Sequence, residues 1–364
     1  MKLSAVNKRN IGRVLPFGII WLVSGALFLW VEHAALGGRA NTLETAIKLD
    51  PGVLTFALAG ITFIGLLVGF IELAYLNRLF EKQRFLVKII SKFLIYAAFF
   101  FVVILIAFPI AASMELNTSV VDQRVWSRYG TFFFSITNAS TMVQLSFQLL
   151  VSLLYAEISE HLGQNVLLNF FTGKYHKPVA ETRIFMFADM KASTSIAEQL
   201  GHIQYFDLLK SYYFDLSDAI VKNHGEVYQY IGDEIVISWK LKNGLENSHC
   251  LQCFFDMKMD LEKRKDSYLK KYGVFPDFKA GLHFGEVTTG EIGALKKEIF
   301  FTGDVLNTTA RIQGLCSEYG VDLLVSKDLI DQLGFRDKYS VQLLGKPQLK
   351  GKIDTLTLVT ISLS

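Results

Sequence analysis

The chain has few cysteines and little charge for its length. Its 364 residues include three cysteines and 20% charged residues, and its net charge is +3. Three cysteines are too few for a disulfide framework, which favours a reducing compartment. A net charge so close to neutral argues against binding to nucleic acid. Hydrophobic residues are in excess at 51%, and their longest runs fall in residues 1–155.

Four of these runs are long and apolar enough to cross a bilayer, which takes about 20 helical residues. They are Leu15–Ala35, Val53–Tyr75, Phe93–Ala112 and Thr131–Tyr155. We therefore predict a membrane anchor over residues 1–155, an all-α bundle of four transmembrane helices in contact with lipid. An alternative is that the first run is a cleaved signal peptide, but it is long for a signal.

The distribution of Lys and Arg predicts the orientation of the anchor. Nine basic residues precede the first run or lie between the second and third: Lys2, Lys8, Arg9, Arg13, Arg78, Lys82, Arg84, Lys88 and Lys92. The other two loops hold only Arg39, Lys48, Arg124 and Arg128. Both termini and the C-terminal half are therefore expected on the cytoplasmic side of the inner cell membrane.

Small and polar residues inside the predicted helices indicate contacts between them. Gly65 and Gly69 form a pair that lets another helix approach closely. Asn138, Gln144 and Gln148 lie in the fourth run, where a polar group is costly unless it finds a partner. We expect these three side chains to face neighbouring helices or to line a site for an unknown ligand.

Residues 156–180 form a predicted helical connector to the second domain. Ile158, Leu162, Val166 and Phe170 recur every four residues and give the helix an apolar stripe. Gly173 ends it. The stripe needs a partner, either the same helix of a second subunit or the chain's own C-terminal domain.

Residues 181–364 alternate between strand-like and helix-like segments. The expected elements are a strand ending at Asp189, a helix over Ser195–Asn223 with a break near Gly201, two strands joined at Gly232-Asp233, a helix over Leu245–Tyr272, a strand, turn and strand over FKAGLHFGEVTTGEIG, a helix over Val305–Tyr319, and strands at Val321–Val325, Tyr339–Leu344 and Thr355–Ile361. The order β-α-β-β-α-β predicts an α+β, ferredoxin-like domain.

Two carboxylates in this domain are candidates for a metal site. Asp189 follows a strand, and Asp233 lies at the tip of a hairpin, so the two can lie side by side on neighbouring strands. Such a pair repels unless a cation lies between its members, and Mg²⁺ prefers a few carboxylates combined with phosphate oxygens. The loop 190–194 leads into a helix N-terminus, whose free N–H groups favour a phosphate.

Asn307 and Arg311 lie four residues apart and so share one face of a predicted helix. An amide and a guanidinium there can orient a ribose and neutralise a phosphoryl group, although a solvated helix face is the alternative. The segment HCLQC carries Cys250 and Cys253, but no second pair lies nearby, so we expect core cysteines. His283 is expected to be structural.

Four segments resemble class III adenylate and guanylate cyclases in order and spacing. FADMKASTSIAEQL and VYQYIGDEIVISW are similar to the two metal segments, and GLHFGEVTTGEIG and GDVLNTTARIQ to the dimer-arm and transition-state segments. The resemblance covers about residues 180–362. It implies a cyclase catalytic domain that acts as a homodimer, because the family builds each site from two subunits.

The resemblance also implies roles for single residues. Asp189, Met190 and Asp233 would form the metal site for two Mg²⁺ or Mn²⁺ ions. Asn307 would orient the ribose, and Arg311 would stabilise charge on the α-phosphate.

Phosphate contacts are implied for a second group of residues. Lys350 or Lys352 resembles the family's phosphate-binding lysine, and Lys296 or Lys297 would assist. Ser193 and Thr194 lie in the loop that favours a phosphate.

The sequence departs from the family at the two positions that recognise the purine base. Gln229 stands where adenylate cyclases commonly have Lys and guanylate cyclases Glu, and Phe300 stands where Asp or Thr is common. The amide of Gln229 can donate or accept a hydrogen bond, so it does not by itself select adenine or guanine. ATP is favoured because Gln229 lacks the acidic group that reads guanine.

The sequence therefore predicts a membrane-anchored adenylate cyclase that converts ATP to cyclic AMP and pyrophosphate in signal transduction. Two alternatives remain: a guanylate cyclase acting on GTP, and a membrane receptor whose cyclase domain is inactive.

Overall fold

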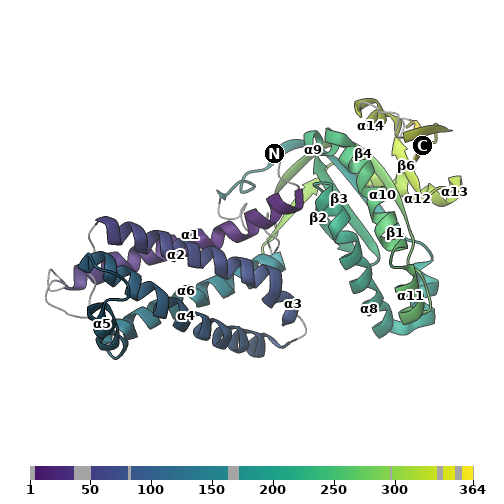
Figure 1. The fold of residues 1–364 in the computed structure, drawn as a ribbon. Coiled ribbons are helices and arrows are strands. Elements are labelled where there is room, and N and C mark those ends of the chain that lie inside the picture. The colour runs from purple at the N-terminus through teal and green to yellow at the C-terminus, as the bar shows by residue number, and fades with distance from the viewer. Residues whose placement is uncertain are drawn as a thin grey trace. The chain divides into compact units, whose positions relative to one another are not determined.

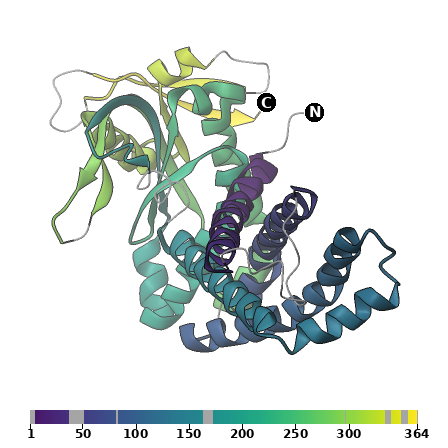
Figure 2. The same ribbon diagram turned by 90° about the vertical axis from the view of Figure 1, so that its left-hand side faces the viewer.

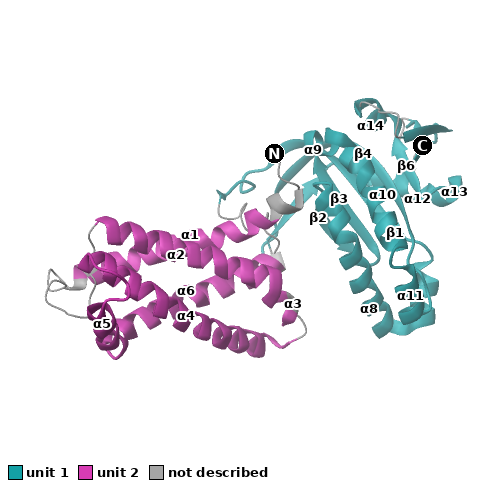
Figure 3. Ribbon diagram, viewed as in Figure 1, with its two compact units in different colours: residues 1–7, 169–364 teal, residues 8–168 magenta. Residues whose placement is uncertain are grey.

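The computed structural model describes residues 5–36, 51–80, 83–162, 172–295, 297–333, 339–348 and 355–363. The chain divides into two compact units, residues 8–168 and residues 1–7 with 169–364 (Figure 3). The first is a helical unit. The second is a mixed sheet with helices, and we call it the catalytic unit because it contains the segments that resemble a cyclase domain. The predicted fold class is confirmed.

The helical unit consists of helices that run back and forth (Figure 1). They are α1 (Ala5–Leu36), α2 (Pro51–Ile71), the π-helical turn η2 (Glu72–Leu76), α3 (Asn77–Leu79), α4 (Phe85–Leu116), α5 (Gln123–Phe133) and α6 (Ile136–Leu162). Within the described residues, four stretches are long and apolar enough to cross a membrane: Asn10–Glu32, Pro51–Leu76, Phe85–Leu116 and Ile136–Glu160. This confirms the four predicted apolar helices.

Gly65 and Gly69 let α1 pack closely against α2. A Cβ atom on Gly65 would lie 2.6 Å from the Cβ of Trp21, and one on Gly69 would lie 2.7 Å from the Cγ of Phe17. Phe17 and Trp21 are fully buried as a result. The indole of Trp21 donates a hydrogen bond of 2.8 Å to the Oγ of Ser152 on α6, which ties a third helix to this contact.

The fourth apolar helix begins later than Thr131, the start predicted from the sequence. Helix α5 ends at Phe133, and α6 begins at Ile136. The Oγ of Ser135 accepts a hydrogen bond of 3.2 Å from the backbone N–H of Asn138, so Ser135 caps α6. The cap separates two helices that hydropathy alone merges, and it leaves Phe134 90% exposed outside both of them.

Lys88 and Lys92 lie on helix α4, not in a loop as the sequence suggested. The apolar run begins near Phe93, but the helix starts at Phe85 because ion pairs hold its first turns. The ammonium of Lys88 lies 2.7 Å from the carboxylate of Glu157 on α6. The ammonium of Lys92 pairs with the buried carboxylate of Glu72 in η2.

The polar residues of α6 differ in how they are satisfied. Asn138 is buried, and its amide donates a hydrogen bond of 2.8 Å to the backbone oxygen of Phe133. Gln148 is fully buried, and neither atom of its amide has a hydrogen-bond partner in the described part of the chain. Gln144 is half-buried. In the predicted connector, α6 continues to Leu162, whereas Val166 and Phe170 lie outside the described residues.

The catalytic unit follows the predicted order β-α-β-β-α-β and then extends it. Its elements are β1 (Val179–Met190), α8 (Ser193–Lys222), β2 (Glu226–Ile231), β3 (Glu234–Lys240), α9 (Leu241–Leu245), η3 (Glu246–Ser248), α10 (His249–Glu262), α11 (Lys265–Tyr272), β4 (Phe278–Ile292), β5 (Glu298–Thr302), α12 (Asp304–Gly314), α13 (Cys316–Tyr319), β6 (Leu323–Ser326), α14 (Lys327–Gln332), β7 (Tyr339–Gly345) and β8 (Leu358–Leu363). The strand order is β2-β3-β1-β4-β6-β8-β7, with β5 paired to β4. Figures 1 and 2 show this sheet from two directions.

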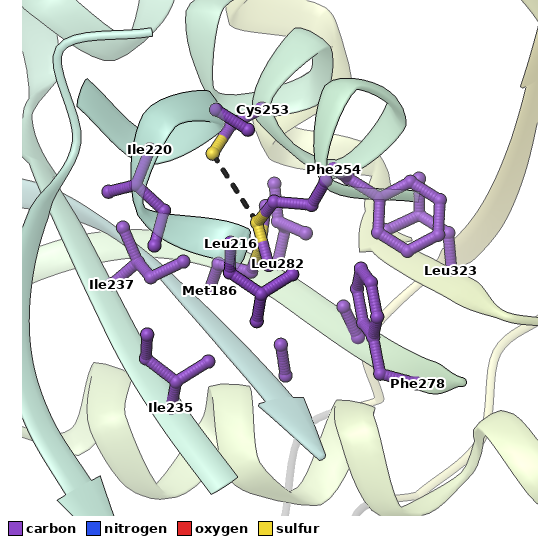
Figure 4. Packing of buried hydrophobic residues seen from close by; sticks show 14 of the residues in the cluster. Met186, Leu216, Ile220, Ile235, Ile237, Cys253, Phe254, Phe278, Leu282 and Leu323 are labelled. Carbon is purple, nitrogen blue, oxygen red and sulfur yellow. Dashed lines mark hydrogen bonds between the residues drawn. The ribbon is translucent and has the colours of Figure 1, made fainter. Parts of the chain in front are cut away.

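The two faces of β1 build two different cores. Met186 and its alternate neighbours face α8 and α10 and join the main core, part of which is drawn in Figure 4. Cys250 and Cys253 are buried there, and the thiol of Cys253 lies 3.6 Å from the sulfur of Met257. They are therefore core residues, as predicted. Phe185 and Phe187 face the opposite way and pack with residues of β5 and α12.

The segment FKAGLHFGEVTTGEIG is one continuous strand, β4, and not the strand, turn and strand predicted from its glycines. Its glycines let helix α12 approach the sheet. A Cβ atom on Gly281 would lie 2.5 Å from the backbone nitrogen of Gln313, and one on Gly285 would lie 3.0 Å from Val305. Helix α12 therefore lies directly on β4.

Two long helices predicted from the sequence are interrupted. The segment Leu245–Tyr272 divides into η3, α10 and α11, with Asn247 and Ser248 in left-handed conformation. The turn before α11 brings the hydroxyl of Tyr268 to within 2.8 Å of the Asp215 carboxylate. The segment Val305–Tyr319 divides into α12 and α13.

Candidate active site

The register of the sheet brings Asp189 and Asp233 together. Near the end of β1, Asp189 lies opposite Glu234, the first residue of β3, so Asp233 in the preceding turn is adjacent. That turn joins β2 to β3 and has Gly232 at φ 64°, a conformation that glycine adopts without strain. Residues directly opposite on paired strands share a face, so Glu234 lies on the same face as Asp189.

The carboxylates at this point repel one another. Burial and the neighbouring Asp233 raise the pKa of Asp189, and the ammonium of Lys279 on β4, 3.8 Å away, opposes this shift. Burial, Asp189 and Asp233 raise the pKa of Glu234 to about 7. The amide of Gln313 donates a hydrogen bond of 3.3 Å to Asp189. Among the described residues, Lys279 and Gln313 contact Asp189, and they leave much of the negative charge of the group uncompensated.

This arrangement fits a hard divalent cation. The Oδ2 atom of Asp233 is buried and has no hydrogen-bond partner among the described residues, so an oxygen ligand is available. The described residues include no group of three or more His, Cys, Asp or Glu side chains arranged to hold a metal. Two carboxylates completed by phosphate oxygens are the kind of site that Mg²⁺ occupies.

The loop after Asp189 ends in a helix N-terminus suited to a phosphate. Helix α8 begins at Ser193 with Thr194 exposed, and its first turn holds no acidic residue. Free N–H groups and the helix dipole favour an anion there. Ala192 starts the helix in left-handed conformation. The side chain of Met190 is buried in the core, so it offers the site only backbone atoms.

Asn307 and Arg311 lie on helix α12 and are not brought to the two carboxylates. Asn307 is exposed and Arg311 is half-buried. In the described part of the chain, neither side chain has a hydrogen bond or an ion pair. The residue of α12 that reaches Asp189 is Gln313, two positions after Arg311. The two predicted transition-state residues are thus free to contact a molecule outside their own chain.

The two candidate base contacts lie on different strands. Gln229 on β2 is exposed and lies opposite Val236 of β3, which places it on the same face as Asp189. Phe300 on β5 is 44% exposed. Among the described residues, no hydrogen bond or ring contact joins the two. Lys296, Lys350 and Lys352 lie outside the described residues, and Lys297 is exposed.

Sequence reasoning did not identify several residues that surround the carboxylates. Glu234 directly follows Asp233, so its position offered a signal. Lys279 on β4 and Gln313 on α12 contact Asp189. Both residues are far from Asp189 in the sequence, so no local sequence pattern predicts these contacts. His283 donates to or accepts from the Oγ of Ser326 at 2.8 Å, consistent with the structural role expected for it.

The sheet order, the paired carboxylates and the amide and guanidinium on α12 define a nucleotide cyclase domain. The chain belongs to the family of adenylate and guanylate cyclase catalytic domains, whose model matches residues 175–362.

Curated relatives and solved structures agree with this assignment. The chain is 35% identical over 205 residues to adenylate cyclase 2 of Rhizobium meliloti (strain 1021), covering 56% of each protein. It is 27% identical over 183 residues to an adenylate cyclase of Anabaena cylindrica, covering 48% of this chain and 36% of that one. The chain thus spans about half or less of these relatives. A bacterial light-regulated adenylyl cyclase shares the fold, with a TM-score of 0.52, 19% identity and coverage of 62% of this chain and 64% of that one.

Proposed function

We propose that this protein is a membrane-anchored adenylate cyclase that converts ATP to 3′,5′-cyclic AMP and pyrophosphate. The observation that carries the proposal is the pair of neighbouring carboxylates, Asp189 and Asp233, in which one buried oxygen has no hydrogen-bond partner among the described residues. The adenylate cyclase relatives in R. meliloti and A. cylindrica support ATP as the substrate.

Each side chain has a defined part in this reaction. The 3′-hydroxyl of the ribose loses its proton to solvent, and its oxygen attacks the α-phosphorus. The bond from the α-phosphorus to the oxygen that bridges to the β-phosphate breaks and releases pyrophosphate. Asp189 and Asp233 would hold two Mg²⁺ or Mn²⁺ ions, which would supply Lewis-acid chemistry that lowers the pKa of the attacking hydroxyl and stabilises the phosphate charge. The N-terminus of α8, with Ser193 and Thr194, binds phosphate oxygens.

Helix α12 supplies the remaining groups to a second subunit. Asn307 orients the ribose, and the guanidinium of Arg311 neutralises the charge that develops on the α-phosphate. Neither residue has a polar partner within the described part of its own chain, which is consistent with a role across a homodimer interface. A symmetric dimer completes two sites, each with carboxylates from one subunit and α12 from the other.

The helical unit anchors the enzyme in the cell membrane. Four helices have the length and composition to span a bilayer. With the excess of Lys and Arg described above, both termini and the catalytic unit lie in the cytoplasm. We further propose that an unknown ligand of the helical unit regulates the cyclase activity. This part of the proposal rests on the buried polar groups of α6.

The first experiment is to measure cyclic nucleotide production by membranes that contain the full chain. ATP and GTP are each supplied with Mg²⁺ or Mn²⁺, and Asp233→Ala is assayed beside the wild type. Cyclic AMP that is lost in the variant is the expected result. Cyclic GMP from GTP would show instead that Gln229 and Phe300 select guanine, and no product from either nucleotide would favour the receptor with an inactive domain.

A complementation experiment tests the shared site. Asp233→Ala and Arg311→Ala chains are each expected to be inactive. When the two are co-expressed, half of the dimers are mixed and each mixed dimer has one intact site, so about a quarter of the wild-type activity should return. Co-expression of Asp233→Ala with Asp189→Ala is the control, because both changes fall in the same half of the site. Activity that failed to return in the first pair would contradict the shared site.

A further inference from the structure

Helix α8 carries a tyrosine that contacts the turn between β2 and β3. The hydroxyl of Tyr213 donates a hydrogen bond of 2.8 Å to the backbone oxygen of Gly232, and the backbone oxygen of Glu234 lies 3.4 Å from it. These two oxygens flank Asp233 on either side. One side chain therefore contacts the backbone immediately before and immediately after a metal-binding carboxylate.

Tyr213 is itself held in a fixed position. Its ring packs on Tyr230 of β2, with centroids 4.5 Å apart. The helix beneath it is anchored by Leu208, Tyr212 and Leu216, which are fully buried in the main core. Burial raises the pKa of the Tyr213 hydroxyl, so the group stays protonated and remains a donor at physiological pH.

The turn needs such a support because its own contacts are few. Gly232 has φ 64° and no side chain, and a Cβ atom there would meet nothing within 4 Å. The Oδ2 of Asp233 has no hydrogen-bond partner among the described residues, so no side-chain contact there orients this carboxylate oxygen. The backbone of the turn therefore contributes to the orientation of Asp233.

We propose that Tyr213 is a positioning residue that holds the β2–β3 turn so that Asp233 is ready to bind the metal ions. This inference rests on the proposed function. Tyr213 does not touch the reacting atoms, and it acts through the backbone oxygens of Gly232 and Glu234. Loss of its hydroxyl should weaken metal binding while leaving the affinity for the nucleotide base unchanged.

The test compares Tyr213→Phe with Tyr212→Phe in the full chain. Both changes remove only a hydroxyl from a ring on α8. The hydroxyl of Tyr212 is buried without a partner in the described part of the chain, which makes it a matched control. Binding of Mn²⁺ to the solubilised chain with a non-cyclisable ATP analogue is measured by electron paramagnetic resonance. The Mn²⁺ and ATP dependence of cyclic AMP production is measured in membranes.

Tyr213→Phe should weaken Mn²⁺ binding about threefold to tenfold, the range expected for one hydrogen bond. It should raise the half-saturating Mn²⁺ concentration to the same extent, with little change in the KM for ATP at saturating metal. Tyr212→Phe should behave as the wild type.

Unchanged Mn²⁺ binding in Tyr213→Phe would overturn the proposal, and so would equal weakening in both variants, because that would indicate a general loss of packing. If the wild type bound Mn²⁺ but formed no cyclic nucleotide, the proposed activity would fail. The comparison of Mn²⁺ affinities would still decide whether Tyr213 positions the turn.

Discussion

One pair of charged residues in the helical unit and one pair in the catalytic unit are arranged in opposite ways. In the helical unit, Glu72 and Lys92 pair with each other, and the hydroxyl of Tyr96 donates a hydrogen bond of 3.2 Å to the same carboxylate. In the catalytic unit, Asp189 and Asp233 lie together and repel. Paired opposite charges hold helices in place, whereas neighbouring like charges are typical of a site where a ligand neutralises them. This contrast separates structural groups from functional ones.

The largest effect that tests this contrast is expected from Asp233→Asn. The change removes a carboxylate that the proposed reaction requires, so cyclic AMP production should fall at least about a thousandfold. The same change removes repulsion from Asp189, so without divalent metal the variant should unfold at the same temperature as the wild type or at a higher one. Both quantities are measured on the same purified protein.

Asp218→Asn on the exposed side of α8 is the control for this experiment. It should change neither activity nor unfolding temperature. A clear loss of stability in Asp233→Asn would show that the carboxylate has a structural role, and the contrast between the units would then be wrong.

The opposite outcome is expected for the paired charges of the helical unit. Lys92→Met leaves the carboxylate of Glu72 buried without its cation, which should cost about 3–5 kcal/mol of unfolding free energy. The double variant Glu72→Gln/Lys92→Met removes both charges and should recover most of that loss. Thermal unfolding in detergent measures both. If the single and double variants were equally unstable, packing and not charge would explain the effect.

A smaller effect is expected where paired charges lie nearer the surface of the catalytic unit. The ammonium groups of Lys191 and Lys258 bridge Asp277 and Asp322, with distances such as 2.7 Å from Lys191 to Asp277 and 2.8 Å from Lys258 to Asp322. Burial opposes ionisation, but hydrogen bonds from the two lysines outweigh it and lower the pKa of Asp277 below its ordinary 3.8. The network also ties the loop after Asp189 to β4 and β6.

Lys258→Met should therefore destabilise the chain by about 1 kcal/mol at pH 7, since solvent screens these partly exposed carboxylates. A carboxylate with a lowered pKa in the folded state stabilises the fold above its ordinary pKa, and this is lost as the pH falls through the folded value. The difference between Lys258→Met and wild type should thus shrink below about pH 4. Lys327→Met, which breaks the exposed pair with Asp331, is the control and should change little. A difference that stayed constant with pH would contradict the network.

The sequence predicted the features that follow from local rules. The four apolar helices came from hydropathy, and the neighbourhood of Asp189 and Asp233 came from a strand end and a hairpin tip. The errors arose where a tertiary contact decides the local structure. A turn was predicted within the segment that contains Gly281, because the helix that Gly281 lets approach, α12, lies in another element. The contact of Gln313 with Asp189 could not be predicted for the same reason.

The smallest effect concerns Gln148, a buried amide in the helical unit that is neither paired nor charged. Its two polar atoms have no hydrogen-bond partner in the described residues, and a Cβ atom on Gly25 of α1 would lie 3.3 Å from its Nε2. An unsatisfied buried amide costs free energy, so Gln148→Leu should leave stability unchanged or raise it by about 1 kcal/mol. Asn138→Leu, which breaks a hydrogen bond to Phe133, should instead destabilise the helical unit.

Thermal unfolding in detergent, with cyclic AMP production measured in parallel, distinguishes two roles for Gln148. Raised stability with unchanged activity would make it a tolerated defect in packing. Raised stability with altered activity would indicate that this amide is retained for a ligand, the role proposed for the neighbouring carboxylates of the catalytic unit.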